Sequence, residues 1–306
     1  MAESSQQGVT KVNNRVSRFP RTENGDTPRI KRPLDELDTV VRGTKQSVQR
    51  LQKRQATPDV STPFSKEVAS PWQDYQKTFK LNQAGYGLVV HAKNATFAEG
   101  ILKEIRGYEK EELSNVTSYS HKNLVRLQRA FYDDGAIFLL YEMMDVTLAQ
   151  IFSSPLGRLQ LYEVAAFSQE ILSGIDYIHN CLKITHGDLT SDSILLSVSG
   201  AIKIANLGTS MLQKSGSREV QEDLKDMGKI ILECLEPATF LKQESSLKSK
   251  SWESDIVEFV ESTKCKSAQF LLQHDFLKLS PGPSCLLPYV RLAREVAAKE
   301  VEMVER

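Results

Sequence analysis

The chain has 306 residues, of which 40% are hydrophobic and 25% charged, a composition typical of globular proteins rather than of fibrous or wholly disordered chains. Its 39 basic and 39 acidic side chains cancel, which argues against a nucleic-acid binder that uses the whole chain. Four widely spaced cysteines form no CxxC pair, so we expect neither a zinc site nor a disulfide framework, and we expect no signal peptide or membrane span.

Residues 1–74 differ in composition from the rest and predict a disordered, basic N-terminal arm. They are rich in Ser, Thr, Gln, Asn and Pro, and residues 11–54 carry 12 Lys and Arg against 5 Asp and Glu. Such a segment buries too little apolar surface to offset its ordering entropy. Within it, an early proline with acidic residues and a basic end favour a short helix over residues 34–54. We favour a solvated tether over a contact for nucleic acid or an anionic membrane through residues 11–54.

From Tyr75 onward, short apolar runs separated by Gly and Asn predict strands. A turn at Asp133-Asp134-Gly135 joins two of them. The expected strands cover residues 79–81, 87–92, 97–105, 124–131 and 136–141. This part of the chain is therefore expected to fold as a small sheet.

After Asp145 the hydrophobic period changes to that of helices. Residues 162–179 repeat apolar side chains at the i, i+3/i+4 spacing of a helix with one buried face. Two short strands are expected at 193–196 and 201–204, and helices resume at Asp223. The fold class is thus α+β, with a small strand-rich lobe, a larger helical lobe and a cleft between them. Residues 293–306 are expected to continue the last helix of the lobe, and a protruding coiled coil is the alternative.

Several segments occur in an order that resembles a eukaryotic protein kinase domain over residues 75–292. They are ILK at 101–103, HKNLV at 121–125, LLYEMM at 139–144, HGDLTSDSILL at 186–196, KIANLG at 203–208, DLKDMG at 223–228 and SAQFLLQHDFL at 267–277. The last of these is similar to serine/threonine kinases of the sterile and mitogen-cascade type. The resemblance implies a two-lobed protein kinase-like fold with its nucleotide cleft between the lobes.

The resemblance also implies roles for individual residues. Lys103 would hold phosphates and pair with Glu112, while Asp188 stands at the position of the catalytic base. Glu112 lies only nine positions after Lys103, so the helix between the lobes must be short and the pair is doubtful. The residues implied to line a vestigial nucleotide cleft are Val89, Ile101, Lys103, Glu142, Met144 and Leu195.

Several positions depart from the family pattern. Asn206 and Ser193 stand at the two metal-ligand positions, and neither supplies the anionic oxygen that Mg²⁺ prefers. In the loop at residues 82–87, Ala84 replaces a motif glycine, and its Cβ obstructs close approach of the backbone to phosphate. Ile101 is bulky where the family has a small residue packed on adenine. We therefore expect no metal and no resident cofactor, with ATP bound weakly and without Mg²⁺.

These departures favour a pseudokinase: a kinase-like domain that is catalytically impaired and works as a scaffold or allosteric partner in signalling. Its partners would be proteins, for example an active kinase or a signalling complex. One alternative is a degenerate but active ATP-dependent serine/threonine kinase that uses Lys103, Glu112 and Asp188. Another is a platform for the basic arm, which would bind nucleic acid or a membrane surface. In each case we expect a cytoplasmic or nuclear location.

Overall fold

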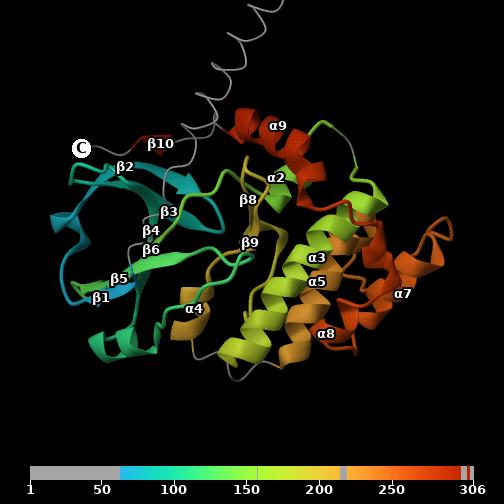
Figure 1. Ribbon diagram of the computed structural model, residues 1–306, viewed down its shortest axis with the longest axis horizontal. Coiled ribbons are helices and arrows are strands. Elements are labelled where there is room, and N and C mark those ends of the chain that lie inside the picture. Colours follow the sequence, from blue (N-terminus) through green and yellow to red (C-terminus); the bar gives the residue numbers. More distant parts are fainter. Residues whose placement is uncertain (1–62, 157, 214–218, 298–301, 304–306) are drawn as a thin grey trace, which may run out of the picture. The chain divides into compact units, whose positions relative to one another are not determined.

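The computed structural model describes residues 63–156, 158–213, 219–297 and 302–303, all of which belong to one unit, Ser61–Arg306 (Figure 1). The predicted helix over 34–54 and the basic stretch 11–54 lie outside the described residues. The strands are β1 (Ser65–Glu67), β2 (Tyr75–Asn82), β3 (Tyr86–Ala92), β4 (Glu99–Arg106), β5 (Leu127–Asp133), β6 (Ala136–Tyr141), β7 (Val146–Thr147), β8 (Ile194–Leu196), β9 (Ile202–Ile204) and β10 (Glu302–Met303).

The helices follow mainly after the first sheet. The α-helices are α2 (Leu148–Phe152), α3 (Leu161–Tyr177), α4 (Leu207–Leu212), α5 (Val220–Leu235), α6 (Pro237–Phe240), α7 (Ser254–Ser262), α8 (Ala268–Leu271) and α9 (Leu287–Ala297). Short 3-10 helices are η2 (Pro71–Gln73), η3 (Lys110–Asn115), η5 (Ser191–Ser193), η6 (Asp275–Leu279) and η7 (Pro283–Leu286), and one π-turn is η4 (Ile178–Leu182). The predicted strands and the long helix are confirmed within a few residues at their ends.

In the described part of the chain, the first lobe is a seven-stranded sheet in the order β1-β5-β6-β4-β3-β2-β10. Strands β2 to β6 pair antiparallel, with Val89 opposite Ile101 and Lys103 opposite Leu139. β6 is buried along its whole length because it lies inside the sheet and both of its faces are covered. The register therefore places Lys103 on a strand directly beside the segment that leads out of the lobe.

The sheet begins earlier in the chain than the sequence indicated. We expected the arm to continue to residue 74, but β1 pairs parallel with β5, and Trp72 packs edge-on against Phe138 at 5.9 Å between ring centroids. Arg129 on β5 lies 2.7 Å from Glu67 and 2.8 Å from Asp74. These two ion pairs and the backbone pairing fasten residues 65–74 to the sheet, so the predicted boundary after residue 74 is wrong.

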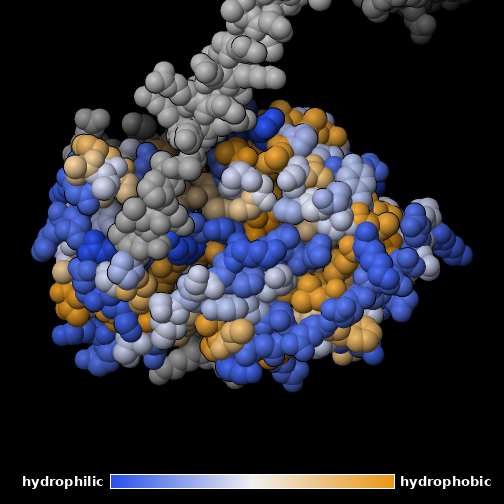
Figure 2. All heavy atoms as spheres, in the orientation of Figure 1, coloured by the Kyte–Doolittle hydropathy of each residue, from blue (hydrophilic) through white to orange (hydrophobic). Residues whose placement is uncertain are grey.

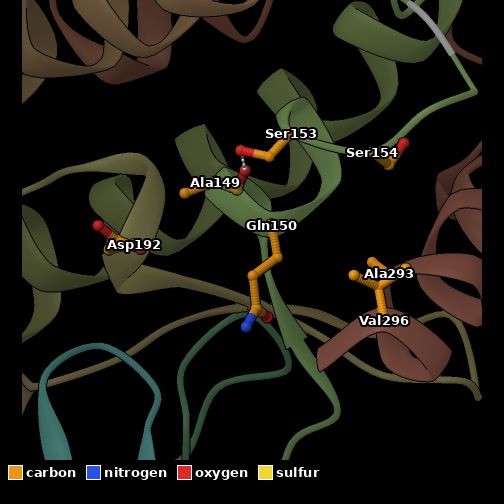
Figure 3. A pocket seen from close by; sticks show the side chains of 7 residues that line it. All are labelled: Ala149, Gln150, Ser153, Ser154, Asp192, Ala293 and Val296. Atoms are coloured by element: carbon orange, nitrogen blue, oxygen red, sulfur yellow. Dashed lines mark hydrogen bonds between the residues drawn. The ribbon is translucent and has the colours of Figure 1, made fainter. Parts of the chain in front are cut away.

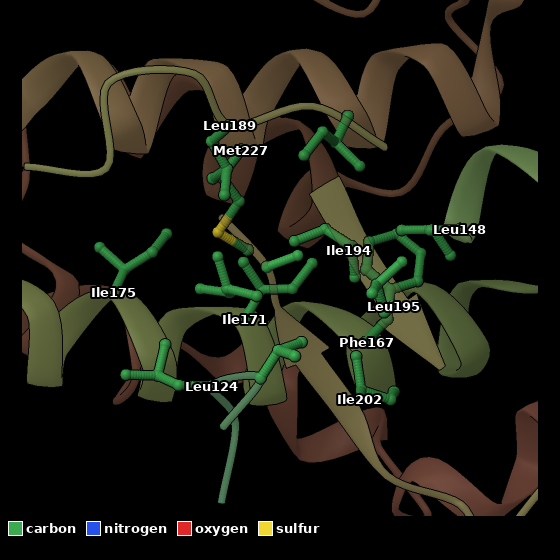
Figure 4. Packing of buried hydrophobic residues seen from close by; sticks show 14 of the residues in the cluster. Leu124, Leu148, Phe167, Ile171, Ile175, Leu189, Ile194, Leu195, Ile202 and Met227 are labelled. Atoms are coloured by element: carbon green, nitrogen blue, oxygen red, sulfur yellow. The ribbon is translucent and has the colours of Figure 1, made fainter. Parts of the chain in front are cut away.

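The helical lobe is built around α3. Its buried face, which includes Phe167, Ile171 and Ile175, packs against the small β7-β8-β9 sheet and against α5 (Figure 4). Figure 1 shows α3, α5, α7 and α8 packed together in the part of the molecule away from the β2–β6 strands. The apolar i, i+3/i+4 pattern gives α3 a hydrophobic face, and the β7-β8-β9 sheet and α5 pack against it to form the core of this lobe. The predicted α+β arrangement with a strand-rich and a helical lobe is confirmed.

The second half of the described chain contains elements beyond those expected, among them α4 and β10. Helix α4 follows directly after β9, where we expected helices to resume only at Asp223. At the other end, α9 buries Val290 and Ala293 and contacts α2 and β7, so it is the last helix of the lobe rather than a protruding coiled coil. Beyond it, β10 adds to the sheet edge beside β2 instead of continuing the helix.

The surface is mixed in polarity. On the face shown in Figure 2, hydrophilic side chains cover much of the surface and hydrophobic patches lie between them. Among the described residues, no helix combines the length and the apolar character that crossing a bilayer requires.

Candidate functional site

We use the name β2–β3 loop for residues 82–87, which include the last residue of β2 and the first two of β3, and this loop folds inward rather than standing open. Gln83 is only 3% exposed and Ala84 only 8%. The chain turns sharply there, because Ala84 adopts a left-handed φ of 53° and Gly85 one of 91°, and the Gln83 N–H donates to the Gly85 carbonyl at 3.1 Å. The turn directs the Gln83 side chain and the Ala84 carbonyl into the space between the lobes.

Gln83 reaches the segment that connects the lobes. Its Nε2 donates a hydrogen bond of 3.1 Å to the backbone carbonyl of Met144, which lies 61 positions later in the chain. Residues 139–144 are the segment that the resemblance assigns to base recognition. The Gln83 side chain of the β2–β3 loop therefore donates to a backbone carbonyl of that segment.

Lys103 and Asn206 hold the other half of the loop. The Lys103 ammonium donates to the Ala84 carbonyl at 2.6 Å, to the Gln83 carbonyl at 3.1 Å and to Asn206 Oδ1 at 2.7 Å. Asn206 Nδ2 in turn donates to the Ala84 carbonyl at 2.9 Å. Burial lowers the pKa of Lys103 to about 8, although the three oxygen acceptors favour its charged form. The structure therefore brings two of the predicted site residues together, around a loop carbonyl.

The predicted pair of Lys103 and Glu112 does not form. Glu112 lies in η3 and its Oε2 accepts from the backbone N–H of Glu109 at 2.9 Å, as part of a capping box at the start of this short helix. The short spacing noted in the sequence explains this, because a 3-10 helix of only six residues fits between β4 and the chain that follows. In the structure Glu112 acts as a local capping residue, and its side chain hydrogen-bonds to Glu109 rather than to Lys103.

Helix α4 packs beside η3 and fixes that arrangement. It begins directly after Asn206, which has a left-handed φ of 65°. A Cβ added to Gly208 would lie 2.6 Å from the Tyr141 hydroxyl oxygen, so only glycine allows the helix to lie this close to β6. Farther along α4, the sulfur of Met211 accepts from the Thr117 N–H at 3.4 Å. The segment after Asn206 is thus packed against the first lobe.

The remaining cleft residues are packed or paired. Val89, Ile101 and Leu195 are buried, and a Cβ on Gly87 would lie 2.6 Å from Ile101 Cγ2. The bulk of Ile101 on β4 is therefore accommodated by the missing side chain of Gly87 on the neighbouring strand β3. Glu142 Oε1 accepts from the Lys203 ammonium at 2.6 Å and from the Arg126 N–H at 2.7 Å, which makes it a brace between the lobes.

Asp223 anchors the loop at residues 186–193, and this role was not assigned from the sequence. Its carboxylate is 1% exposed and accepts from the backbone N–H groups of His186 and Gly187 at 2.8 and 2.9 Å and from His179 Nε2 at 2.7 Å. Burial opposes ionisation, but the hydrogen bonds from His179 and the two backbone groups outweigh it and lower the pKa of Asp223. The available signal was an acidic residue on the apolar face of α5.

Asp188 and Ser193 lie in this anchored loop. Neither is among the hydrogen-bond partners of Lys103 within the described residues. Ser193 Oγ donates to the Thr190 carbonyl at 2.8 Å and accepts from the Thr190 N–H at 2.9 Å, so both functions of the hydroxyl serve the loop itself. Asp188 is exposed. It borders a pocket of about 450 Å³ whose other lining residues are Leu189, Thr190, Glu222, Asp226, Lys229, Ile230, Glu233 and Phe240.

These residues do not fit a magnesium–nucleotide complex. Asn206 offers a neutral carboxamide whose oxygen already accepts from Lys103, and Ser193 is bonded within its own turn. Hard divalent cations need anionic oxygens, which neither position supplies. The acceptor at Met144 and the ammonium at Lys103 are both bonded to the β2–β3 loop.

A separate pocket of about 280 Å³ lies between α2 and α9 (Figure 3). It is lined by Ala149, Gln150, Ser153, Ser154, Asp192, Ala293 and Val296. Inside it, Ser153 Oγ donates back to the Ala149 carbonyl at 3.0 Å. None of the predicted nucleotide-cleft residues lines it, so it is a different feature of the helical lobe.

The family model of the protein kinase domain matches residues 75–228 of this chain. The match runs from β2, through the β2–β3 loop and the loop anchored by Asp223, into α5. It therefore covers both Lys103 and Asp188, and it includes the elements of the two lobes that meet at Asn206. On this match and on the two-lobed fold, the chain belongs to the protein kinase domain family.

Proposed function

We propose that this chain is a pseudokinase: a catalytically impaired kinase-like domain that acts by binding, as a scaffold or allosteric partner of another signalling protein. The observation that carries the proposal is the bonding of Asn206. Asn206 stands at a metal-ligand position and carries no charge. Its carboxamide oxygen accepts a hydrogen bond from Lys103, and its amide nitrogen donates one to the Ala84 carbonyl. Phosphoryl transfer depends on positioned charge around the phosphates, and this position supplies none.

Two further features support the same reading. Glu112 caps η3 instead of pairing with Lys103, so the lysine has no carboxylate partner among the contacts of the described residues. Ser193, at the second metal position, is bonded to Thr190 on both its donor and its acceptor side. We accordingly propose that ATP binds weakly and that Mg²⁺ does not strengthen its binding.

The direct test measures transfer of labelled phosphate by the purified full-length protein to itself and to generic serine/threonine substrates. The matched control is Asp188→Asn, which removes the only carboxylate at the base position. We expect the same background from both proteins. Activity in the unmodified chain that disappears in the Asp188→Asn variant would refute the pseudokinase assignment.

A degenerate but active serine/threonine kinase is the second candidate, and the exposure of Asp188 beside an open pocket favours it. The two candidates differ in metal dependence. An active enzyme should show a melting temperature that rises with ATP and Mg²⁺ together more than with ATP and EDTA, because ligand binding stabilises the native state. We propose a cytoplasmic or nuclear site of action for either candidate.

A further inference from the structure

The contacts of the β2–β3 loop converge on the groups that a nucleotide would need. Gln83 bonds to the Met144 carbonyl in the connecting segment, and the Ala84 carbonyl receives both the Lys103 ammonium and the Asn206 amide. One part of the loop thus lies where a base would be read and the other where phosphates would be held. Because all of these partners are already bonded, a nucleotide could bind them only by displacing the loop.

We propose that the β2–β3 loop is an intramolecular occupant of the nucleotide cleft, and that the cleft admits a purine nucleotide, without metal, only when this loop is displaced. The inference goes beyond the proposed function, since it concerns access to the cleft and holds whether or not phosphate is transferred. Its test reads binding and side-chain accessibility rather than phosphotransfer, so the two can fail separately.

The bonding pattern depends on side chains at three separate positions, Gln83, Lys103 and Asn206. Residue 84 takes part through its backbone, because its carbonyl is the acceptor that Lys103 and Asn206 share. Gln83 has the length and the amide donor to span the cleft to Met144. Asn206, unlike an aspartate, can donate to the Ala84 carbonyl while accepting from Lys103. Asn206, which departs from the family pattern at a metal-ligand position, is therefore one of the residues that hold the loop in place.

The closed arrangement also carries costs that make it reversible. Ala84 has a left-handed φ of 53°, which is unfavourable for a residue with a Cβ. The Gln83 side-chain oxygen is buried and finds no hydrogen-bond partner among the described residues. A closed loop with both a strained residue and an unpaired acceptor is held by a small balance of terms, so the loss of one contact should shift it toward the open state.

The first experiment titrates full-length protein with a fluorescent ATP analogue in EDTA. Gln83→Ala removes the bond to Met144, and Tyr86→Ala is the matched control, since Tyr86 belongs to the same loop but is 77% exposed. We expect Gln83→Ala to bind about tenfold tighter than the unmodified protein, the change that one lost hydrogen bond produces, and Tyr86→Ala to bind as the unmodified protein does. Ala84→Gly, which relieves the strain, should bind no tighter.

The second experiment measures how accessible the Lys103 amine is to solvent. An amine-directed reagent is applied to the unmodified protein, and the labelling of Lys103 is compared with that of the exposed Lys80 by mass spectrometry. Because burial lowers the pKa of Lys103, more of this amine is uncharged and reactive, so slow labelling must come from the loop that covers it. We expect Lys103 to label slowly in the unmodified protein and faster in Gln83→Ala.

Each outcome decides the question. Labelling of Lys103 as fast as that of Lys80 in the unmodified protein means that the loop does not cover the cleft, and the proposal is then wrong. Equal nucleotide affinity of the unmodified protein and Gln83→Ala overturns it as well, whether both bind or neither does. A gain in affinity and in labelling that is confined to Gln83→Ala supports it.

Discussion

Asp223 provides the sharpest test of how the helical lobe holds its loop, and the test is the substitution Asp223→Asn. The carboxylate accepts three hydrogen bonds, from His179 Nε2 and from the backbone N–H groups of His186 and Gly187. Asparagine has one acceptor oxygen, so at least one of these donors is left buried beside an NH₂ group. An unsatisfied buried donor costs about 1–3 kcal/mol, and the loss of charge on the remaining bonds adds roughly 1–2 kcal/mol. We expect a loss of about 2–5 kcal/mol in the free energy of unfolding.

The matched control is Asp226→Asn, one turn farther along α5. Asp226 pairs with Lys229 three positions on, and the Lys229 side chain is half exposed, so the same chemical change there should cost less than about 1 kcal/mol. Urea unfolding of the full-length proteins, followed by circular dichroism, gives both values. If the two variants differ by less than about 1 kcal/mol, Asp223 is not the anchor that its contacts indicate.

Three further predictions concern the pH dependence of the Asp223 contribution, the ion pairs of Arg129 and the attachment of β1. Asp223 has a lowered pKa in the folded state, so its contribution to stability is present above about pH 4 and is lost as the pH falls through the folded pKa. The free energy of unfolding should therefore fall less on acidification in Asp223→Asn than in the unmodified protein. Arg129→Met keeps much of the apolar packing but removes two ion pairs, and should lower the free energy of unfolding by about 1–2 kcal/mol in a urea titration. A chain that starts at Tyr75 should melt at a lower temperature than one that starts at residue 63, because it lacks β1 and η2; equal melting temperatures would restore the boundary first expected.

The sequence alone was sufficient for the strands β2 to β6, for the pair β8 and β9, and for the long helix α3. The short apolar runs at 87–92 and 136–141 correspond to β3 and β6, because a short apolar run is typical of a buried strand. The helical period of 162–179 corresponds to α3, because burial of one helix face imposes a period that can be read directly. It also showed that the catalytic pattern is altered at Asn206. The separation of nine positions from Lys103 to Glu112 was enough to question their pairing, since chain length limits where a carboxylate can reach.

Only the tertiary structure determined which groups Gln83 and Asn206 bond to. Nothing local in residues 82–87 states that Gln83 reaches Met144 or that Asn206 bonds to the Ala84 carbonyl, because these contacts join segments 61 and 122 positions apart. The attachment of β1 to β5 was missed for the same reason: a three-residue strand has too short a pattern to be recognised, and its pairing depends on Arg129, more than 60 positions away. Periodicity reports which face of an element is buried, whereas a hydrogen bond between distant segments depends on the packing of the elements that carry them.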